Sequence, residues 1–411
     1  MAKIIPFRGI LYNTSRVAME DVLAPPYDVI TPEYREALYM QSPRNVVRID
    51  FGKEFPSDTE SENRYTRARR CLDEWMREGV FIRSEKPSFY AYEMEYMVEK
   101  RKKRLLGFLA LVKLEELGKG SVYPHECTYS KPKQDRLNLM RACEGNISPI
   151  FSLYRSSGGD IASVLSKTSA GKPYIEATDI AGDVHRLWQI DNQDEIKSIQ
   201  REFEDKAVFI ADGHHRYETA FEFYKEMASK ESASPGRPFD HVLMFLANMM
   251  DEGLTILPTH RLLKEVPEDI QGILAQYFEI EPVNNGFEIV GSLSGKQSVF
   301  GFFQRGSDTW HLLTYKGGDL SEIHTDLRGV DVMILHELVL KKILHTTDIG
   351  YEMNVGIALE KVKNGDFDAV FFLNPTRVED VEKSALSSVR MPPKSTYFYP
   401  KLLTGLVINK W

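Results

Sequence analysis

Residues 207–230, AVFIADGHHRYETAFEFYKEMASK, contain the clearest signal of local structure in the sequence. The apolar run at 207–210 predicts a buried strand. Apolar residues at positions 217, 220, 221, 224 and 227 have the spacing of one face of a helix. The periodicity changes at residues 212–216, DGHHR. The stretch therefore predicts a strand, a tight polar turn and an amphipathic helix.

The turn has the composition of an anion-binding site. Gly213 permits a backbone conformation that other residues resist, and the first N–H groups of a helix lack intrahelical partners and carry partial positive charge. Arg216 can hold a phosphate through parallel hydrogen bonds, and His214 or His215 can donate to it. Asp212 can hold a divalent cation or orient a hydroxyl. We therefore predict that this turn binds phosphate.

Other interpretations of the turn remain open. In one, Asp212 only caps the helix and the histidines are solvated polar residues. In another, His214, His215 and Glu218 bind a metal ion, because they lie three or four residues apart on the predicted helix. The HExxH and CxxC patterns typical of metal sites are absent from the sequence, so phosphate binding is the better supported interpretation.

Composition limits the class of protein. The chain has 411 residues, enough for two or three domains, and 60 acidic against 52 basic residues give a formal net charge of −8. This balance argues against a dedicated nucleic-acid-binding protein. The 3 cysteines form no CxxC motif, which is typical of a reducing compartment. Because the sequence shows neither a membrane-spanning apolar run nor a signal pattern, we expect a cytoplasmic protein without a membrane partner.

Strand and helix patterns are mixed along the chain and predict an α/β or α+β fold. We expect an N-terminal α/β extension (1–95), a central unit that holds the turn (96–264), and a C-terminal α/β unit whose tail returns to the core (265–411). In the central unit, residues 88–97 and 104–117 predict a hairpin with a basic tip, and residues 241–250 and 253–263 predict a strand pair. In the C-terminal unit, residues 267–280 predict a helix.

A second group of polar residues follows a predicted strand. His125, Glu126 and Thr128 precede Asp135 and Arg136, a density of ionisable groups that is unusual for a buried surface. A glutamate beside a phosphate-binding turn can act as a general base toward a substrate hydroxyl, and neighbouring polar groups can contact the substrate. An exposed loop with internal ion pairs explains this segment equally well.

Together, the DGHHR turn (212–216) and the PHE segment (124–126) make residues 105–262 similar to the ParB/sulfiredoxin-like superfamily, and specifically to its free serine kinases. The resemblance implies a central nucleotide-binding unit of that fold, with Glu126 as the base that activates the serine hydroxyl. It also implies that Asp212, His214, His215 and Arg216 bind nucleotide phosphate and metal. Mg²⁺ with ATP or ADP is the implied cofactor, and a small hydroxylated metabolite such as L-serine is the implied substrate.

The resemblance extends to other positions and has limits. Thr259, His260 and Arg261 lie in the last strand that it covers, and we expect them to face the substrate. The chain departs from the smaller kinases in its N-terminal region, in an insertion before the DGHHR strand and in its C-terminal unit. Position 214 is histidine where sulfiredoxins use a catalytic cysteine, so sulfiredoxin chemistry is not expected. Over its whole length the chain also resembles the domain-of-unknown-function 1015 family, which has no settled activity.

The C-terminal segment MPPKSTYFYPKLLTGLVI contains Lys394 and Lys401. Both lysines can reach a bound phosphate, but a terminal strand that completes a sheet explains the segment slightly better. The sequence as a whole favours a small-molecule phosphotransferase. A nucleotide-binding sensor without turnover and a metal-dependent phosphatase or other hydrolase are the alternatives, and a homo-oligomer remains open.

Overall fold

The structure is a computed structural model that describes residues 2–128, 130–230, 236–284 and 286–411; the side chains of residues 130–132 and 287 lie outside this description. The described residues divide into two compact units. The first unit contains Met1–Pro124, Thr128–Thr255 and Pro400–Trp411, and the second contains His125–Cys127 and Ile256–Tyr399. Each unit has its own sheet and its own hydrophobic core.

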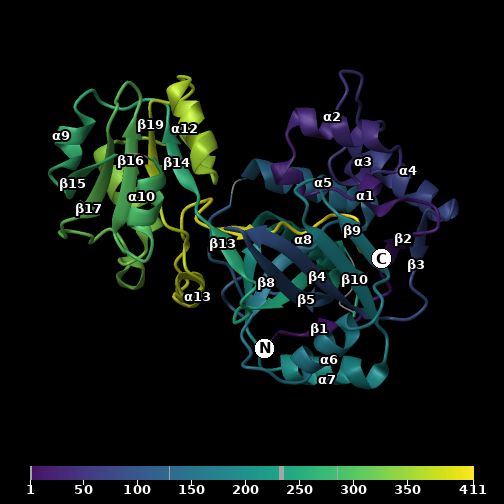
Figure 1. Ribbon diagram of the computed structural model, residues 1–411. Helices are drawn as coiled ribbons and strands as arrows, with labels where there is room; N and C mark the ends of the chain where they lie inside the picture. Colours follow the sequence, from purple (N-terminus) through teal and green to yellow (C-terminus); the bar gives the residue numbers. More distant parts are fainter. Residues whose placement is uncertain (1, 129, 231–235, 285) are drawn as a thin grey trace. The chain divides into compact units, whose positions relative to one another are not determined.

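A mixed sheet forms the centre of the first unit (Figure 1). Its strands are β1 (Ile4–Ile5), β4 (Phe89–Val98), β5 (Arg101–Lys113), β6 (Val122–Tyr123), β8 (Ile150–Tyr154), β9 (Ile175–Thr178), β10 (Val184–Ile190), β11 (Val208–Asp212) and β12 (His241–Asn248). Among the described residues these nine strands follow the order β6-β11-β8-β12-β5-β4-β10-β9, with β1 paired to β5. β12 runs parallel to β8 and antiparallel to β5, and β11 runs antiparallel to β8. The strand that leads into the DGHHR turn therefore lies near one end of the strand order.

The hairpin of β4 and β5 is the longest pairing of this sheet. Side chains on both faces of β4 are buried, among them Phe89, Tyr90 and Tyr92. Glu99 and Lys100 form the turn, with φ angles of 49° and 64°. This left-handed two-residue turn matches the twist of the strands, so the ladder begins directly at Val98 and Arg101. The predicted hairpin is confirmed, but the basic residues 101–104 begin β5 and are not part of the turn.

Helices surround the sheet of the first unit. They are α1 (Met19–Val22), α2 (Pro32–Gln41), α3 (Val47–Asp50), α4 (Arg64–Arg77), α5 (Ser130–Cys143), α6 (Asp160–Ser169), α7 (Gln193–Phe203) and α8 (His214–Lys230), with short 3-10 turns η1 (Tyr27–Val29) and η2 (Pro238–Asp240). α6, α7 and α8 place Ile161, Ile199 and Phe223 in one core cluster with Phe108 and Met244 of the sheet. α6 and α7 lie side by side against it (Figure 1). Burial of these apolar faces holds the helices on the sheet.

Short strand pairs tie the ends of the chain into the first unit. β2 (Ile10–Tyr12) pairs with β3 (Phe81–Arg83), and β7 (Gly145–Asn146) pairs with β21 (Asn409–Lys410). Ile408 also forms a bridge with Ile10, and Thr404 forms one with Ala24. The last residues of the chain therefore contribute strand partners to this unit.

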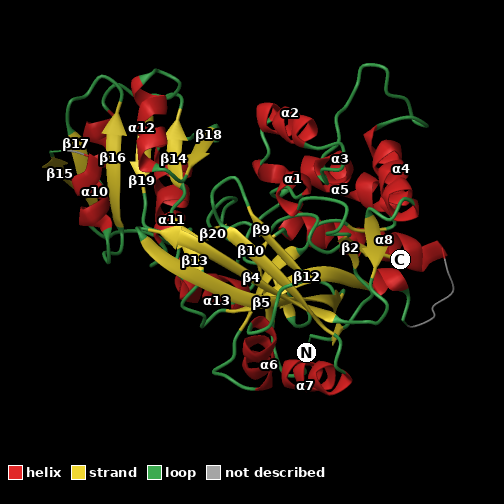
Figure 2. Ribbon diagram, turned by 45° about the vertical axis from the view of Figure 1, so that its right-hand side comes forward, coloured by secondary structure: helices red, strands yellow, loops and turns green. Residues whose placement is uncertain are grey.

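The second unit has an antiparallel sheet (Figure 2). Its strands are β14 (His260–Leu263), β15 (Phe278–Val283), β16 (Val299–Gln304), β17 (Trp310–Tyr315), β18 (Ile349–Glu352) and β19 (Ala369–Phe372), and β13 (Thr255–Leu257) pairs separately with β20 (Tyr397–Tyr399). In the described part of the chain the six-stranded order is β15-β17-β16-β19-β14-β18. The helices are α9 (Ile270–Leu274), α10 (Gly286–Leu293), α11 (Asp331–Met333), α12 (Val355–Lys363) and α13 (Val378–Leu386), with a 3-10 turn η3 (Thr325–Leu327) and a π-helical stretch η4 (Ile334–Ile343). α10 and α12 lie beside the sheet (Figure 2). Their buried side chains share a core cluster with it.

Two predictions of local structure are wrong. Residues 241–250 and 253–263 do not pair with each other, because both edges of β12 are occupied by β5 and β8. β14 pairs with β18 and β19 instead. The helix predicted at 267–280 is only α9, and β15 follows it. Phe278 and Ile280 alternate there with Glu279 and Glu281, which is the periodicity of a strand.

The predicted α/β class is confirmed by the mixture of sheets and helices in both units. The division at residues 95 and 264 follows composition, whereas the compact units follow packing: residues on both sides of position 95 share the first sheet, and the units change at residues 255–256. The predicted division into three separately acting domains stays a prediction. In the residues that the structure describes, no helix is both long and apolar enough to cross a membrane.

Candidate functional site

The predicted strand, turn and helix at residues 207–230 are confirmed. β11 ends at Asp212, and α8 begins at His214. Gly213 between them has a φ of +95°, a region that residues with a Cβ atom rarely adopt. A Cβ atom at this position would also lie 2.9 Å from Nε and 3.0 Å from Cζ of Arg216. Two features therefore require glycine at position 213: the backbone conformation and the guanidinium of Arg216, which lies against this residue.

Arg216 is held at the start of α8 with only 9% of its surface exposed. One Nη atom donates to the backbone oxygen of Pro149, and the other lies 3.8 Å from Oδ1 of Asp212. Its Nε is buried and has no hydrogen-bond partner among the described residues. A buried donor of this kind is costly unless a ligand or water accepts from it.

Asp212 is bound by a residue from the far end of the chain. Nζ of Lys401 donates to Oδ2 of Asp212 at 2.8 Å, and the lysine side chain is only 14% exposed. Both residues belong to the first unit. The carboxylate of Asp212 thus lies between the cations of Lys401 and Arg216, directly before the first N–H groups of α8. The turn combines positive charge, a helix N-terminus and one carboxylate.

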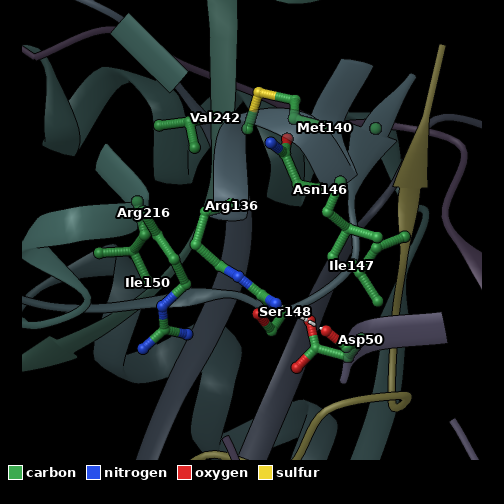
Figure 3. A pocket seen from close by; sticks show the side chains of 11 residues that line it. Asp50, Arg136, Met140, Asn146, Ile147, Ser148, Ile150, Arg216 and Val242 are labelled. Atoms are coloured by element: carbon green, nitrogen blue, oxygen red, sulfur yellow. Dashed lines mark hydrogen bonds and ion pairs between the residues drawn. The ribbon is translucent and has the colours of Figure 1, made fainter. Parts of the chain in front are cut away.

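A small cavity adjoins the turn (Figure 3). Arg216, Arg136, Asp50 and Ser148 line its polar side, and Ile150 is among its apolar residues. Arg136 donates to the Asp50 carboxylate at 3.0 Å and to the Asp50 backbone oxygen at 2.8 Å. The cavity volume of about 30 Å³ suits water molecules or the end of a ligand, not a nucleotide.

The sequence analysis did not identify Asp50. This residue is 3% exposed, and its Oδ2 is buried with no partner in the part of the chain that the structure describes. Burial raises the pKa of Asp50, and the nearby Arg136 and Arg216 oppose that rise. At Arg136 burial lowers the pKa of the guanidinium, but the carboxylates of Asp50 and Asp135 outweigh this effect and raise the pKa above its usual value. The available signal was an acidic residue between the apolar residues Ile49 and Phe51.

The alternative metal set of His214, His215 and Glu218 is not brought together. Among the described residues no three His, Cys, Asp or Glu side chains form a group that could hold a metal ion. Oε2 of Glu218 instead accepts hydrogen bonds from Thr128 at 2.7 Å and from Lys133 at 2.9 Å. Thr128, which we expected to contact substrate, is therefore a partner of α8.

The other predicted site residues lie in the second unit, around the turn 392–396. Oε1 of Glu126 accepts hydrogen bonds from the backbone N–H groups of Ser395 at 2.6 Å and Thr396 at 3.3 Å. Nε2 of His125 lies 2.9 Å from the Thr396 hydroxyl. Arg261, 1% exposed, donates to the backbone oxygen of Lys394 at 3.0 Å. The predicted residues His125, Glu126, Arg261 and Lys394 are thus neighbours.

Thr259 and His260 are buried beside Arg261, at the start of β14. Nδ1 of His260 accepts from the backbone N–H of Leu373, which leaves Nε2 as the protonated nitrogen of the neutral ring. Burial, assisted by the neighbouring Arg261, lowers the pKa of His260 to about 4. In the described structure His260 Nε2 and Thr259 Oγ1 have no hydrogen-bond partner. These polar atoms are candidates for ligand contacts.

The predicted site residues therefore form one group in each unit. Asp212, Gly213, His214, His215 and Arg216 belong to the first unit, together with Thr128. His125, Glu126, Thr259, His260, Arg261 and Lys394 belong to the second. Their assignment to catalysis, substrate binding and metal binding stays a prediction.

Comparison with known proteins gives a family. The sequence model described as "Protein of unknown function (DUF1015)" matches residues 4–333, which is most of the chain. No curated protein matches the chain significantly.

Solved structures show a partial likeness. A free serine kinase in complex with AMP is 12% identical, with 69% of this chain and 92% of that chain covered and a TM-score of 0.36. A conserved hypothetical protein from Pyrococcus furiosus is 14% identical, with 68% and 87% covered and a TM-score of 0.35. SbnI from Staphylococcus aureus, with a C-terminal truncation, is 10% identical, with 72% and 85% covered and a TM-score of 0.36. These identities and TM-scores are low, so the site itself must carry the functional argument.

Proposed function

The chain belongs to the DUF1015 family of proteins of unknown function, and we propose from its own site that it is a phosphotransferase, which moves a phosphoryl group from ATP or ADP to the hydroxyl of a small metabolite. The observation that carries the proposal is the turn at Gly213. There the N-terminus of a long helix meets a buried arginine whose Nε has no hydrogen-bond partner among the described residues.

A phosphate group matches the hydrogen-bond donors of this turn. The first N–H groups of α8 point out of the helix and carry partial positive charge. Phosphate oxygens accept from such groups and from a guanidinium at the same time. The φ of +95° at Gly213 permits the chain to turn, and the missing side chain leaves room for the guanidinium of Arg216 beside the first N–H groups of α8. We therefore assign Gly213, His214, His215 and Arg216 to phosphate binding.

The residues present also fit a magnesium ion. Mg²⁺ in nucleotide enzymes is usually held by one or two carboxylates and by phosphate oxygens, so a large cluster of protein ligands is not needed. Asp212 is the carboxylate at the turn and is the residue that would hold it. The ion would neutralise negative charge on the phosphates.

The reaction needs positioning and one proton acceptor more than covalent chemistry. The acceptor oxygen forms a bond to the terminal phosphorus while the bond from that phosphorus to the bridging oxygen breaks. The nucleotide, shortened by one phosphate, keeps the electron pair, and the hydroxyl proton passes to a base. Glu126 remains our proposed base. Its carboxylate orientation is fixed by the N–H groups of Ser395 and Thr396, which leaves it well ordered for that role.

Phosphorus NMR of the purified full chain tests the proposal. The chain is incubated with Mg²⁺, ATP or ADP and a pool of hydroxylated amino acids and hydroxy acids that includes L-serine. We expect a new phosphoester, and we expect Glu126→Gln to slow its formation about 10²- to 10⁴-fold because a general base is lost. Glu115→Gln is the matched control, since Glu115 also accepts backbone N–H groups, from Ser121 and Val122, and has no assigned chemistry.

Binding measurements separate the possible outcomes. Calorimetric titration with ADP should show binding to the wild type and to both glutamine variants, and much weaker binding to Arg216→Lys, because lysine cannot reproduce the guanidinium geometry. Nucleotide binding without any product would exclude the phosphotransferase and favour a sensor. Absence of nucleotide binding would exclude both functions.

A further inference from the structure

The C-terminal segment Pro400–Trp411 is a built part of the first unit. Its residues Leu402, Leu403, Leu406 and Val407 are each at most 5% exposed. Backbone hydrogen bonds join Thr404 to Ala24 and Ile408 to Ile10, and β21 pairs with β7. The yellow segment in Figure 1 that ends at the label C is this part of the chain. The backbone next to Lys401 is therefore fixed, although the residue is only ten positions from the end.

The ammonium group of Lys401 lies at the proposed phosphate site. Its Nζ is 2.8 Å from Oδ2 of Asp212, the residue directly before Gly213. The opposite oxygen of Asp212 is 3.8 Å from Nη2 of Arg216. Asp212 is 22% exposed, and the lysine and arginine side chains are 14% and 10% exposed. Two cations on one carboxylate leave net positive charge at the N-terminus of α8, where a helix already favours anions.

We propose that Lys401 binds the second phosphate of a diphosphate group at this turn, so that the site selects diphosphate and triphosphate over single phosphate groups. The inference rests on the proposed function, because it takes the turn at Gly213 as the place of the first phosphate. It adds a residue and a ligand preference to that site.

The division of the two phosphates follows from the donors available. The helix N-terminus and the guanidinium of Arg216, whose buried Nε has no hydrogen-bond partner among the described residues, can satisfy the oxygens of one phosphate. A second phosphate adds charge that these groups cannot fully compensate. The lysine ammonium is a compact charge on a flexible four-carbon stem, so it can move from Asp212 to a phosphate oxygen while the backbone stays in place. The carboxylate of Asp212 is then left for Mg²⁺.

A purely structural role for Lys401 makes a different prediction. If the lysine only anchors the C-terminal segment to Asp212, its loss weakens binding of every anion through disorder of the turn. If it contacts the second phosphate, its loss weakens binding of diphosphate and leaves binding of single phosphate intact. The ratio of the two affinities therefore distinguishes the roles, whatever the stability of the variant.

The experiment is calorimetric titration of the full chain with sodium orthophosphate and sodium pyrophosphate, with and without MgCl₂. We expect Lys401→Met to weaken pyrophosphate binding about 10- to 100-fold, as for a lost charge-assisted hydrogen bond, and to change orthophosphate binding by less than about 2-fold. Lys401→Arg should restore most of the affinity. Lys410→Met is the matched control: this lysine lies on the same segment, is 12% exposed and donates to the backbone oxygen of Cys143. It should change neither affinity.

Each outcome decides between the claims. Equal losses for both anions in Lys401→Met, or no loss at all, would overturn the role of Lys401 while the proposed function stands. Selective loss of pyrophosphate binding in a protein that binds no ADP would support Lys401 and overturn the nucleotide-dependent function. A wild-type chain that binds neither phosphate ion would overturn both.

Discussion

At the scale of single residues, the turn at 212–216, which we propose binds phosphate, depends on a glycine that has no side chain. Gly213 supplies a positive φ and leaves room for the guanidinium of Arg216. Arg216 in turn is buried, with its Nε unpaired within the described structure, which is tolerable where a ligand or water completes the hydrogen bonding. The two residues therefore depend on each other: the missing Cβ atom of Gly213 leaves a space, and the guanidinium of Arg216 occupies it.

Gly213→Ala tests whether the position of Arg216 depends on the glycine. The left-handed backbone should cost about 1–2 kcal/mol of stability once a Cβ atom is present, and the displaced guanidinium should abolish binding of orthophosphate. Gly182→Ala is the matched control, because Gly182 has a φ of +86° with open space around its missing Cβ. We expect a similar loss of stability in denaturant unfolding but unchanged phosphate binding. Retained binding in Gly213→Ala would show that Arg216 is not the phosphate ligand.

His260 predicts a pH dependence of stability in the second unit. Its pKa of about 4 in the folded state lies below the usual value near 6.5, so the unfolded chain binds more protons between these pH values. Stability is therefore fully present above about pH 6.5 and is lost as the pH falls toward 4, by about 3 kcal/mol for a shift of this size. The measurement is urea unfolding of the wild type and of His260→Gln at pH 7.5, 5.5 and 4.5.

The variant isolates the titration because glutamine is neutral at every pH. We expect its unfolding free energy to fall less than that of the wild type over this range. His324→Gln, at an exposed histidine of the same unit, should follow the wild type. Parallel curves for the wild type and His260→Gln would mean that His260 is not buried as a neutral ring.

At the scale of elements, local signals fixed the type of structure wherever one periodicity dominated. The strand and helix on either side of Gly213, and the hairpin of β4 and β5, were predicted because their apolar residues repeat with periods of helix or strand. The helix predicted at 267–280 failed because a short helix gives way to a strand within it, so neither period covers the whole window. The predicted pairing of residues 241–250 with 253–263 was wrong for another reason: strand pairing is not a local property.

Ile408 tests how strongly the C-terminal segment is built into the first unit. The side chain is 0% exposed, and its backbone pairs with that of Ile10. Ile408→Ala should cost about 2–5 kcal/mol through lost burial and the cavity that remains. Ile180→Ala is the matched control on the same unit, because Ile180 is 82% exposed, and should change stability by less than about 0.5 kcal/mol. Similar values for both variants would show that the segment contributes little to the fold.

At the scale of the whole molecule, the two compact units predict separate unfolding. Each has its own sheet and core, and Trp310 is the tryptophan of the second unit, whereas Trp75, Trp188 and Trp411 belong to the first. With 5-fluorotryptophan incorporated, fluorine NMR during heating should show different midpoints for these signals. Ile408→Ala should lower the midpoint of the first group alone, and Leu262→Ala, at a buried residue of β14, should lower that of Trp310 alone. A common shift of all four signals would contradict this prediction.

The sequence alone determined the strand, turn and helix at 207–230, the hairpin and the mixed α/β class, because those follow from local periodicity and from the backbone freedom of glycine. Only the tertiary structure decided which distant residues meet at the turn and in the cavity beside it. Lys401 meets Asp212 across 189 positions, and Arg136 meets Asp50 across 86. Such pairs depend on the order of strands in the sheet and on which polar groups become buried together. Periodicity encodes which face of an element is apolar, but it does not encode the partner that the face will meet.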